Sequence, residues 1–241
     1  MEIIDYNGYH DVSVRFDDGT IVKCSINNFR NGAVRNPNAI SVCDIGVIGN
    51  KYQIHNENGK LTKEYIVWSH MLKRCYKNNM SSRNISYLGC TVCDEWLYFP
   101  NFYDWLHNQE NYYKWKTEKY MLDKDIIQKG NKRYEPEKCC LVPYYINMLL
   151  TSHKRKRGKY PIGVIYNKNN NCFDVCVNDG ILTGKRTIHL SGFSNSTIAF
   201  EKYKELKEKI IKARAKQEYE KSNITKKCYD ALMNYKIDAT D

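Results

Sequence analysis

The chain has 241 residues, of which 38 are Lys or Arg and 27 are Asp or Glu, so its formal net charge is +11. Apolar residues make up 42% and charged residues 27% of the chain, which excludes a disordered acidic or low-complexity protein. The longest apolar-rich stretch, Cys139–Leu150, is too short for a bilayer crossing. The basic excess favours a polyanionic partner, either nucleic acid or an anionic membrane surface.

The cellular compartment is indicated by the N-terminus and the cysteines. The opening residues MEIIDYNGYH lack the basic and apolar regions of a signal peptide. Ten cysteines without an export signal indicate reduced thiols in a cytosol. We therefore expect a cytoplasmic location and no disulfides.

The positive charge is concentrated in one part of the chain. Residues 151–221 carry 16 Lys or Arg and 7 Asp or Glu, whereas residues 1–150 carry 19 and 17. This part opens with the basic run His153–Lys159, which predicts a linker between domains. A linker this basic repels itself unless phosphate neutralises it, which favours nucleic-acid binding. A solvated, charge-rich hinge without a partner is the alternative.

The first residues alternate apolar and polar side chains. Residues 10–26 show this period of two, and Asp17, Asp18 and Gly19 predict a hairpin turn. We interpret residues 1–58 as a small β-rich module, to which we assign no catalytic or binding residues.

A helix and an aromatic segment follow. Residues 61–80 place Trp68, Met71, Leu72 and Cys75 on one helical face. A short strand is expected over Tyr87–Cys93 and a helix over Asp94–Leu106. The aromatic side chains of that helix are expected to be core rather than base-stacking residues: Trp96, Phe99, Phe102 and Trp105.

The middle of the chain predicts a ββα unit. Met121–Ile127 and Cys140–Val142 are typical of strands, a turn covers Lys129–Lys132, and a helix begins at Pro143. We assign residues 59–152 to one domain around this unit.

The C-terminal part, residues 153–241, predicts a three-stranded antiparallel sheet and helices. Its strands are expected at Tyr160–Tyr166, Cys172–Asn178 and Lys185–Leu190. A helix capped by Ser194 or Ser196 follows, with its remaining face lined by lysines that we interpret as solvated: Lys202, Lys204, Lys207, Lys209 and Lys212. Its buried face is expected to carry Ala199, Tyr203, Leu206, Ile210 and Ala213, and a last helix is expected over Thr225–Asn234. The fold class expected for the whole chain is α+β.

Residues 65–150 resemble phage-encoded HNH homing-endonuclease-like proteins. The strongest matching piece is Leu122–Ile126, with the sequence LDKDI. The other matching pieces are Trp68–Tyr76, Tyr87–Trp96, Phe99–Trp105, Gly130–Cys139 and Val142–Asn147. This resemblance implies a ββα-metal nuclease that acts on double-stranded DNA in a bacterial host.

Residues 158–237 are similar to the plant ethylene-response-factor (Apetala-type) DNA-binding domain. The matching pieces are Gly158–Val164, His189–Phe193 and Ala199–Lys204, in this order. In that domain a three-stranded sheet lies in the major groove, whose width fits a β-ribbon.

The HNH resemblance also implies a set of site residues. Asp125 and Asn147 would hold one Mg²⁺, and Asn131 would be the orienting residue of the turn. The first strand has no histidine, so Asp123 and Lys124 are the remaining catalytic candidates on it. An Asp of ordinary pKa, about 4, is a poor base. The alternative is a catalytically degenerate protein derived from an HNH nuclease. It would act by binding alone, either as a regulator or as an inhibitor of a host defence protein or nucleoprotein.

Candidate DNA contacts lie in the linker and at the ends of the C-terminal strands. Arg186 is the best base-reading candidate, because a guanidinium pairs bidentately with guanine. The complete set is Lys154, Arg155, Lys156, Arg157, Lys159, Lys168, Lys185 and Arg186.

Four cysteines have spacing that allows a structural zinc site. Cys90 and Cys93 form a CxxC pair that Cys75 and Cys139 would complete. A single CxxC is a weak signal, and buried free thiols are the preferred interpretation.

Overall fold

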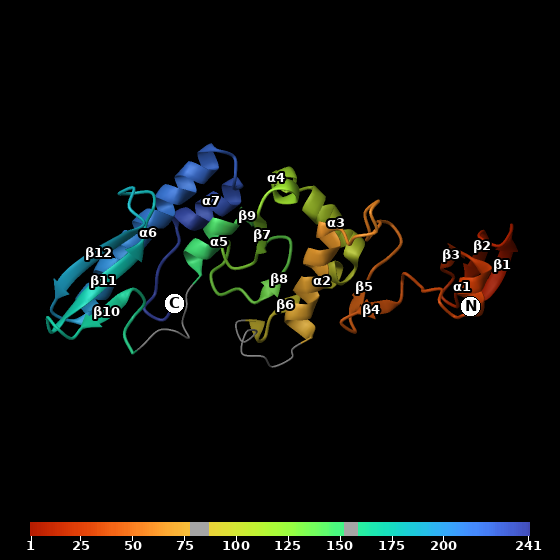
Figure 1. Cartoon of the computed structure of the whole chain (residues 1–241), viewed down its shortest axis with the longest axis horizontal. Coiled ribbons are helices and arrows are strands. Elements are labelled where there is room, and N and C mark those ends of the chain that lie inside the picture. The colour runs from red at the N-terminus through yellow and green to blue at the C-terminus, as the bar shows by residue number, and fades with distance from the viewer. Residues whose placement is uncertain (78–86, 152–158) are drawn as a thin grey trace. The chain divides into compact units, whose positions relative to one another are not determined.

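The computed structural model describes residues 1–77, 87–151 and 159–241. The chain divides into two compact units, Met1–His107 and Asn108–Asp241, which are coloured red to yellow-green and green to blue in Figure 1. Helices alternate with several small, mostly antiparallel sheets, so the expected α+β class is confirmed. The boundary between the units falls inside the range 59–152 that we assign to a single central domain.

The first unit begins with a three-stranded antiparallel sheet of order β1-β2-β3. The predicted hairpin is present: Phe16 N–H bonds the Thr20 carbonyl at 2.8 Å, and Gly19 takes a left-handed φ of +85°. Val12 and Val14 are fully buried and pack on Ile26 of α1, as the alternation predicts. The elements of this region are β1 (Glu2–Tyr6), β2 (Val12–Arg15), β3 (Ile21–Cys24), α1 (Ile26–Arg30), β4 (Ile40–Val42) and β5 (Gly46–Val47).

The rest of the first unit is built around aromatic side chains. Trp68 of α2 is fully buried and donates its indole N–H to the Trp96 carbonyl at 2.7 Å. Phe99 and Phe102 are fully buried and Trp105 is half-buried, so these side chains form a core as expected. The elements here are α2 (Lys63–Tyr76), β6 (Thr91–Val92), a 3₁₀ helix (Asp94–Leu97) and α3 (Phe99–His107).

The second unit contains the ββα unit and the C-terminal sheet. Both contribute to one hydrophobic core, in which Val142 and Ile146 are grouped with Val175 and Ile210. Its helices are α4 (Tyr112–Thr117), α5 (Tyr144–Leu150), α6 (Ser196–Glu220) and α7 (Lys226–Met233). Its strands are β7 (Tyr120–Asp123), β8 (Arg133–Tyr134), β9 (Cys140–Pro143), β10 (Val164–Asn167), β11 (Cys172–Asn178) and β12 (Thr187–Phe193).

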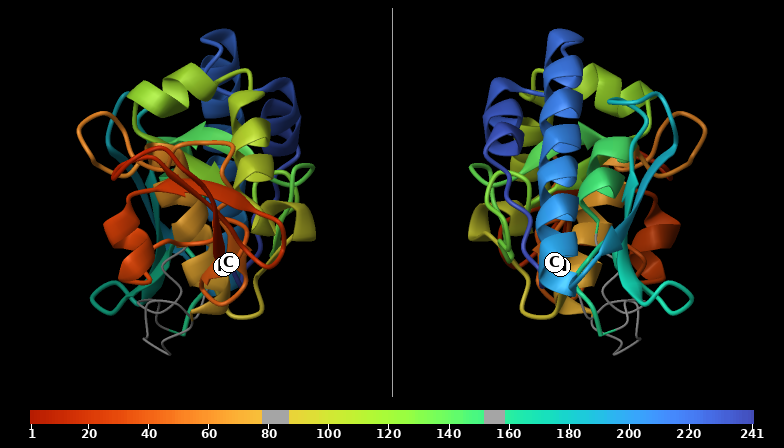
Figure 2. Two further views of the ribbon diagram at one scale, coloured as in Figure 1. Left: turned by 90° about the vertical axis from the view of Figure 1, so that its right-hand side faces the viewer. Right: turned by 90° about the vertical axis from the view of Figure 1, so that its left-hand side faces the viewer.

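The C-terminal sheet is antiparallel in the order β10-β11-β12, as predicted. The long helix α6 runs along one face of it (Figures 1 and 2). The buried side chains Val164, Val175 and Val177 alternate along the strands and therefore form this covered face. Gly163 lets the chain pass close to α6, because an added Cβ there would lie 1.9 Å from the Tyr203 ring.

The ends of two helices differ from or refine the prediction. The cap of α6 is Asn195 rather than Ser194 or Ser196, and its side-chain oxygen accepts the Ile198 N–H at 2.9 Å. The cap of α7 is Thr225, at the predicted start.

Within the described residues, no helix has both the length and the apolar character needed to cross a membrane.

Candidate functional site

The ββα unit is formed by β7, β9 and α5. Strands β7 and β9 are antiparallel with Asp123 opposite Cys140, and α5 follows directly after Pro143. The first strand ends at Asp123, four residues before the predicted end. The loop that begins there carries all but one of the residues expected for a catalytic site.

Asp123 ends the strand because its side chain takes over backbone donors. Its Oδ1 accepts the N–H of Asp125 at 2.7 Å and of Ile126 at 2.9 Å, so these groups turn away from a strand ladder. Burial raises the pKa of Asp123, while the two N–H bonds lower it and leave a net upward shift. The two hydrogen bonds to Asp125 and Ile126 make the Asp123 carboxylate the acceptor that builds the turn. Its raised pKa also makes it a stronger base than an ordinary Asp.

Lys124 and Asp125 form an ion pair at the start of the loop. The Lys124 ammonium is 2.7 and 2.8 Å from the two Asp125 carboxylate oxygens and donates to the Asn131 carbonyl at 2.8 Å. The Lys124 side chain is 6% exposed, whereas that of Asp125 is 50% exposed. Lys124 is thus saturated with acceptors, and Asp125 is the acidic group that solvent reaches.

Asn131 closes the same loop from its other end. Its buried amide donates to the Lys124 carbonyl at 2.9 Å and to the Arg133 carbonyl at 2.6 Å, and its oxygen accepts the Arg133 N–H at 3.1 Å. Lys124 and Asn131 therefore bind each other's main chain reciprocally. The fold brings together Asp123, Lys124, Asp125 and Asn131 in one loop.

Asn147 is placed separately, on α5. It is half-buried, and its main-chain carbonyl accepts the Thr151 N–H at 3.2 Å. Over residues 1–77, 87–151 and 159–241, no hydrogen bond connects the Asn147 side chain to the loop of Asp125. The Asp125 oxygens face an ammonium, whose charge opposes a second cation at the same place. A magnesium ion held by Asp125 and Asn147 stays a prediction.

The cysteines proposed for zinc are all buried and outside any disulfide: Cys75, Cys90, Cys93 and Cys139. In the part of the chain that the structure describes, no three His, Cys, Asp or Glu side chains are grouped so as to hold a metal ion.

The uncovered face of the C-terminal sheet is neutral over most of its area. Ile165 is 55% exposed there, and His189 is exposed with its Nε2 3.9 Å from the Cys176 sulfur. Asn167 donates to Asp174, the one charged residue in these strands, at 2.9 Å. Strands β10, β11 and β12 contain no Lys or Arg, so base reading would fall to neutral side chains.

Exposed cations flank this face instead. Lys168 lies in the turn between β10 and β11, whereas Lys185 and Arg186 lie in the loop between β11 and β12. Arg186 is one residue before β12 begins, so it stands at the strand end and not on the face. Lys159 is exposed, and Lys154, Arg155, Lys156 and Arg157 lie outside the described residues.

Asp179, which the sequence analysis did not single out, organises the loop that carries Lys185 and Arg186. Its carboxylate accepts the N–H groups of residues 181–183 and the Thr183 hydroxyl. Burial raises the pKa of Asp179, but these hydrogen bonds outweigh it and leave the pKa below its usual value. An Asp that precedes a Gly-containing loop is the sequence signal for such a turn.

The lysines of α6 are not all solvated as predicted. Lys202 is half-buried and Lys209 is exposed, and both pair with Glu205, at 2.8 and 2.6 Å. Lys207 is half-buried and lines a pocket against α5, which the sequence alone did not indicate. Its spacing of seven residues from Arg214 is the signal that could have identified it.

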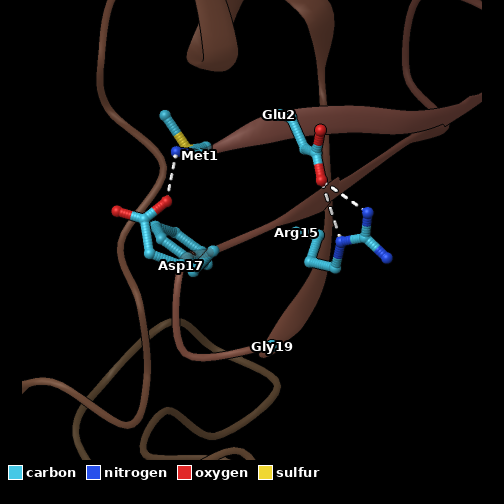
Figure 3. A pocket seen from close by; sticks show the side chains of 6 residues that line it. Met1, Glu2, Arg15, Asp17 and Gly19 are labelled. Atoms are coloured by element: carbon cyan, nitrogen blue, oxygen red, sulfur yellow. Dashed lines mark hydrogen bonds and ion pairs between the residues drawn. The ribbon is translucent and has the colours of Figure 1, made fainter.

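A second pocket, of about 460 Å³, lies on the N-terminal sheet and is shown in Figure 3. In this pocket the N-terminal ammonium of Met1 is 3.1 Å from the Asp17 carboxylate, and the Arg15 guanidinium is 2.5 Å from the Glu2 carboxylate. These charges neutralise one another, so the pocket is a poor candidate for an anion or cation site.

Comparisons with known proteins found no match for this chain among protein-family models, curated proteins or solved structures.

Proposed function

We propose that the chain is a phage-type double-stranded-DNA-binding protein that acts in the cytoplasm of a bacterial host and holds DNA through the sheet β10-β11-β12. The observation that carries this proposal is the arrangement of the sheet: one face is covered by α6, and the other is nearly neutral with exposed cations at both of its ends. The charge distribution supports it too, because residues 108–241 carry 27 Lys or Arg against 16 Asp or Glu.

The dimensions of the sheet suit a DNA groove. Strand β11 has seven residues, which at about 3.4 Å each separates the Lys168 turn from the Arg186 loop by roughly 20 Å. The major groove is about 12 Å wide, so cations at this separation would lie beyond its edges, beside the phosphates. Phosphate contacts fix register and orientation, while the neutral face between them would meet base edges.

The proposal is tested by fluorescence anisotropy with a labelled duplex. The variant K168Q/K185Q/R186Q is expected to bind at least about tenfold more weakly and to lower the salt slope by roughly three, one for each lost phosphate contact. The matched control R30Q/R35Q/K60Q removes three exposed cations from the first unit and should bind like wild type. Equal loss in both variants would show that the sheet has no special role.

Hydrolysis of the bound DNA is the second candidate, and Asp125 favours it. Its carboxylate is half exposed at the edge of the ββα loop, beside the turn built by Asp123. A plasmid-cleavage assay with Mg²⁺ or Mn²⁺ tests this candidate. Cleavage that disappears in both Asp125→Ala and Asn147→Ala, with DNA binding retained, would support a nuclease.

A non-catalytic role is the remaining alternative. Tight DNA binding without cleavage under either metal would favour a regulator, or an inhibitor of a host defence protein or nucleoprotein. In that case the loop would serve as a scaffold, which agrees with the many hydrogen bonds that Lys124 and Asn131 spend on it.

A further inference from the structure

A pocket of about 800 Å³ lies within the second unit, between α5, α6 and the end of β11. Met148 and Leu149 contribute one wall from α5, and Ile162 contributes apolar surface ahead of β10. Its volume and mixed lining are typical of small-molecule sites, which combine apolar walls with a few polar groups. It is separate from both the ββα loop and the flanking cations of the sheet.

Two cations of α6 and the residue at its C-cap line this pocket at intervals of seven residues: Lys207, Arg214 and Lys221. Residues seven apart lie on the same face of a helix, because seven residues make nearly two turns. The rise between Lys207 and Arg214 is about 10 Å, with Ile210 between them. This face of α6 thus presents positive charge at two levels of the pocket, on either side of the buried Ile210.

Lys207 is the side chain that needs explanation. It forms no hydrogen bond or ion pair with any residue that the structure describes, and burial lowers its pKa to about 8. Its neighbours Lys202 and Lys209 instead share the Glu205 carboxylate. Since a partly buried ammonium without a protein acceptor is unfavourable, a ligand that supplies an acceptor would stabilise it.

The acidic groups of the pocket are already engaged. Glu218 is buried and accepts the Tyr145 hydroxyl and the Asn223 amide, with Arg214 at 3.9 Å. Asp179 accepts the N–H groups of its own loop. The Arg214 guanidinium lies 5.9 Å from the centre of the Tyr145 ring. The charge left for a ligand is therefore positive, and Lys207 is its centre.

The edge of β11 adds main-chain donors. The Cys176 N–H bonds the Gly163 carbonyl at 3.0 Å, beyond the first paired residue of β10. By the alternation of an antiparallel strand, the Asn178 N–H points to the same edge, where β10 has ended. Asn178 also lines the pocket. A main-chain N–H beside a lysine is a common combination for binding phosphate oxygens.

We propose that this pocket binds a phosphate monoester with an aromatic body, of the size of a mononucleotide. Its phosphate accepts hydrogen bonds from the Lys207 ammonium and the Asn178 N–H, and its ring packs on Leu149 and Met148. The same chemistry has two sources, a free nucleotide or the 5′-phosphate end of a DNA strand. The proposal does not depend on the role of the sheet, because the pocket shares none of the cations tested there.

The test uses adenosine monophosphate, with adenosine as the probe that lacks phosphate, and isothermal titration calorimetry on the full chain. Wild type should bind the monophosphate at least tenfold more tightly than adenosine, and Lys207→Met should remove the difference. Methionine matches the length of the stem and leaves no unpaired amine, so this variant should fold. Lys209→Met is the matched control on the same helix and should bind as wild type does.

A second arm distinguishes the sources. Duplexes with a 5′-phosphate or a 5′-hydroxyl are compared in wild type, Lys207→Met and K168Q/K185Q/R186Q. A preference for the 5′-phosphate that only Lys207→Met removes would identify the DNA end as the ligand, whatever the triple variant does to overall affinity. If neither the nucleotide nor the phosphorylated end is preferred, or if Lys209→Met has the same effect as Lys207→Met, the proposal is wrong.

Discussion

The two units of the molecule contrast in charge. Residues 1–107 carry 11 Lys or Arg and 11 Asp or Glu, so the first unit is formally neutral, whereas residues 108–241 carry 27 and 16. The whole net charge of +11 therefore belongs to the second unit. The first unit is instead distinguished by a core of aromatic side chains around Trp68 and Trp96. The comparison predicts that the proposed binding of a polyanion resides in the second unit.

The salt dependence of DNA binding gives the largest expected effect. If six to ten phosphates are neutralised, affinity should fall about 10³–10⁵-fold between about 50 and 200 mM salt. Anisotropy titrations at four or more salt concentrations measure the slope. A slope near zero would show that the positive charge of the second unit contacts no phosphates.

Two glycines test how tightly each unit is packed. Gly163→Ala would place a Cβ 1.9 Å from Tyr203 at a φ of +76°, so we expect a loss of about 3 kcal/mol in the free energy of unfolding of the second unit. Gly46→Ala, 2.5 Å from Leu72, should cost roughly 2 kcal/mol in the first.

The control for these variants is Gly184→Ala, which has a φ of +70° and no neighbour within 4 Å, and should cost only about 1 kcal/mol. Urea unfolding followed by circular dichroism measures all three. Tryptophan fluorescence reports mainly on the first unit, which holds three of the four tryptophans. Equal costs for Gly163→Ala and Gly184→Ala would contradict the close approach to α6.

Asn131→Ala tests how much the Asn131 amide stabilises the ββα loop. The amide makes three main-chain hydrogen bonds in a buried position, so its loss should lower the free energy of unfolding by about 2 kcal/mol. Asn170→Ala, at an exposed turn, is the control and should stay within about 0.5 kcal/mol. A stable Asn131→Ala protein would mean that the loop does not depend on this residue.

The smallest expected effect concerns the pH dependence of stability. Because burial raises the folded pKa of Asp123, its contribution is fully present below the unfolded pKa of about 4 and is lost as pH rises through the folded pKa. Asp123→Asn keeps the Oδ1 acceptor without the charge, so its stability relative to wild type should increase as the pH rises from 4 to 7. Parallel stability curves for the two proteins would refute the raised pKa.

Most of the fold could be predicted from periodicity. The alternation at Val12 and Val14 and the helical spacing of Trp68, Met71 and Leu72 give the buried faces that the structure has. The ends of elements were less predictable. Asp123 stops β7 through its own side chain, and Asn195 caps α6 in competition with two neighbouring serines.

The candidate site could be predicted only where its residues lie close together in the sequence. The pattern from Asp123 to Asn131 lies within one loop, so its members meet without help from the rest of the fold. Lys207 was misjudged as solvated, because helical spacing gives the face of a residue and not what packs against it. Enclosure by α5 comes from tertiary structure that a periodic pattern does not contain.

The neutral face of the β10-β11-β12 sheet has a consequence for how a target could change. With the cations confined to the strand ends, the strength of attachment and the choice of sequence would reside in different residues. If the sheet binds DNA as proposed, substitutions at positions such as Ile165 or His189 would change the preferred sequence while the affinity from phosphate contacts stays the same. With these roles in separate residues, single substitutions could change the preferred DNA sequence without producing an intermediate that fails to bind DNA.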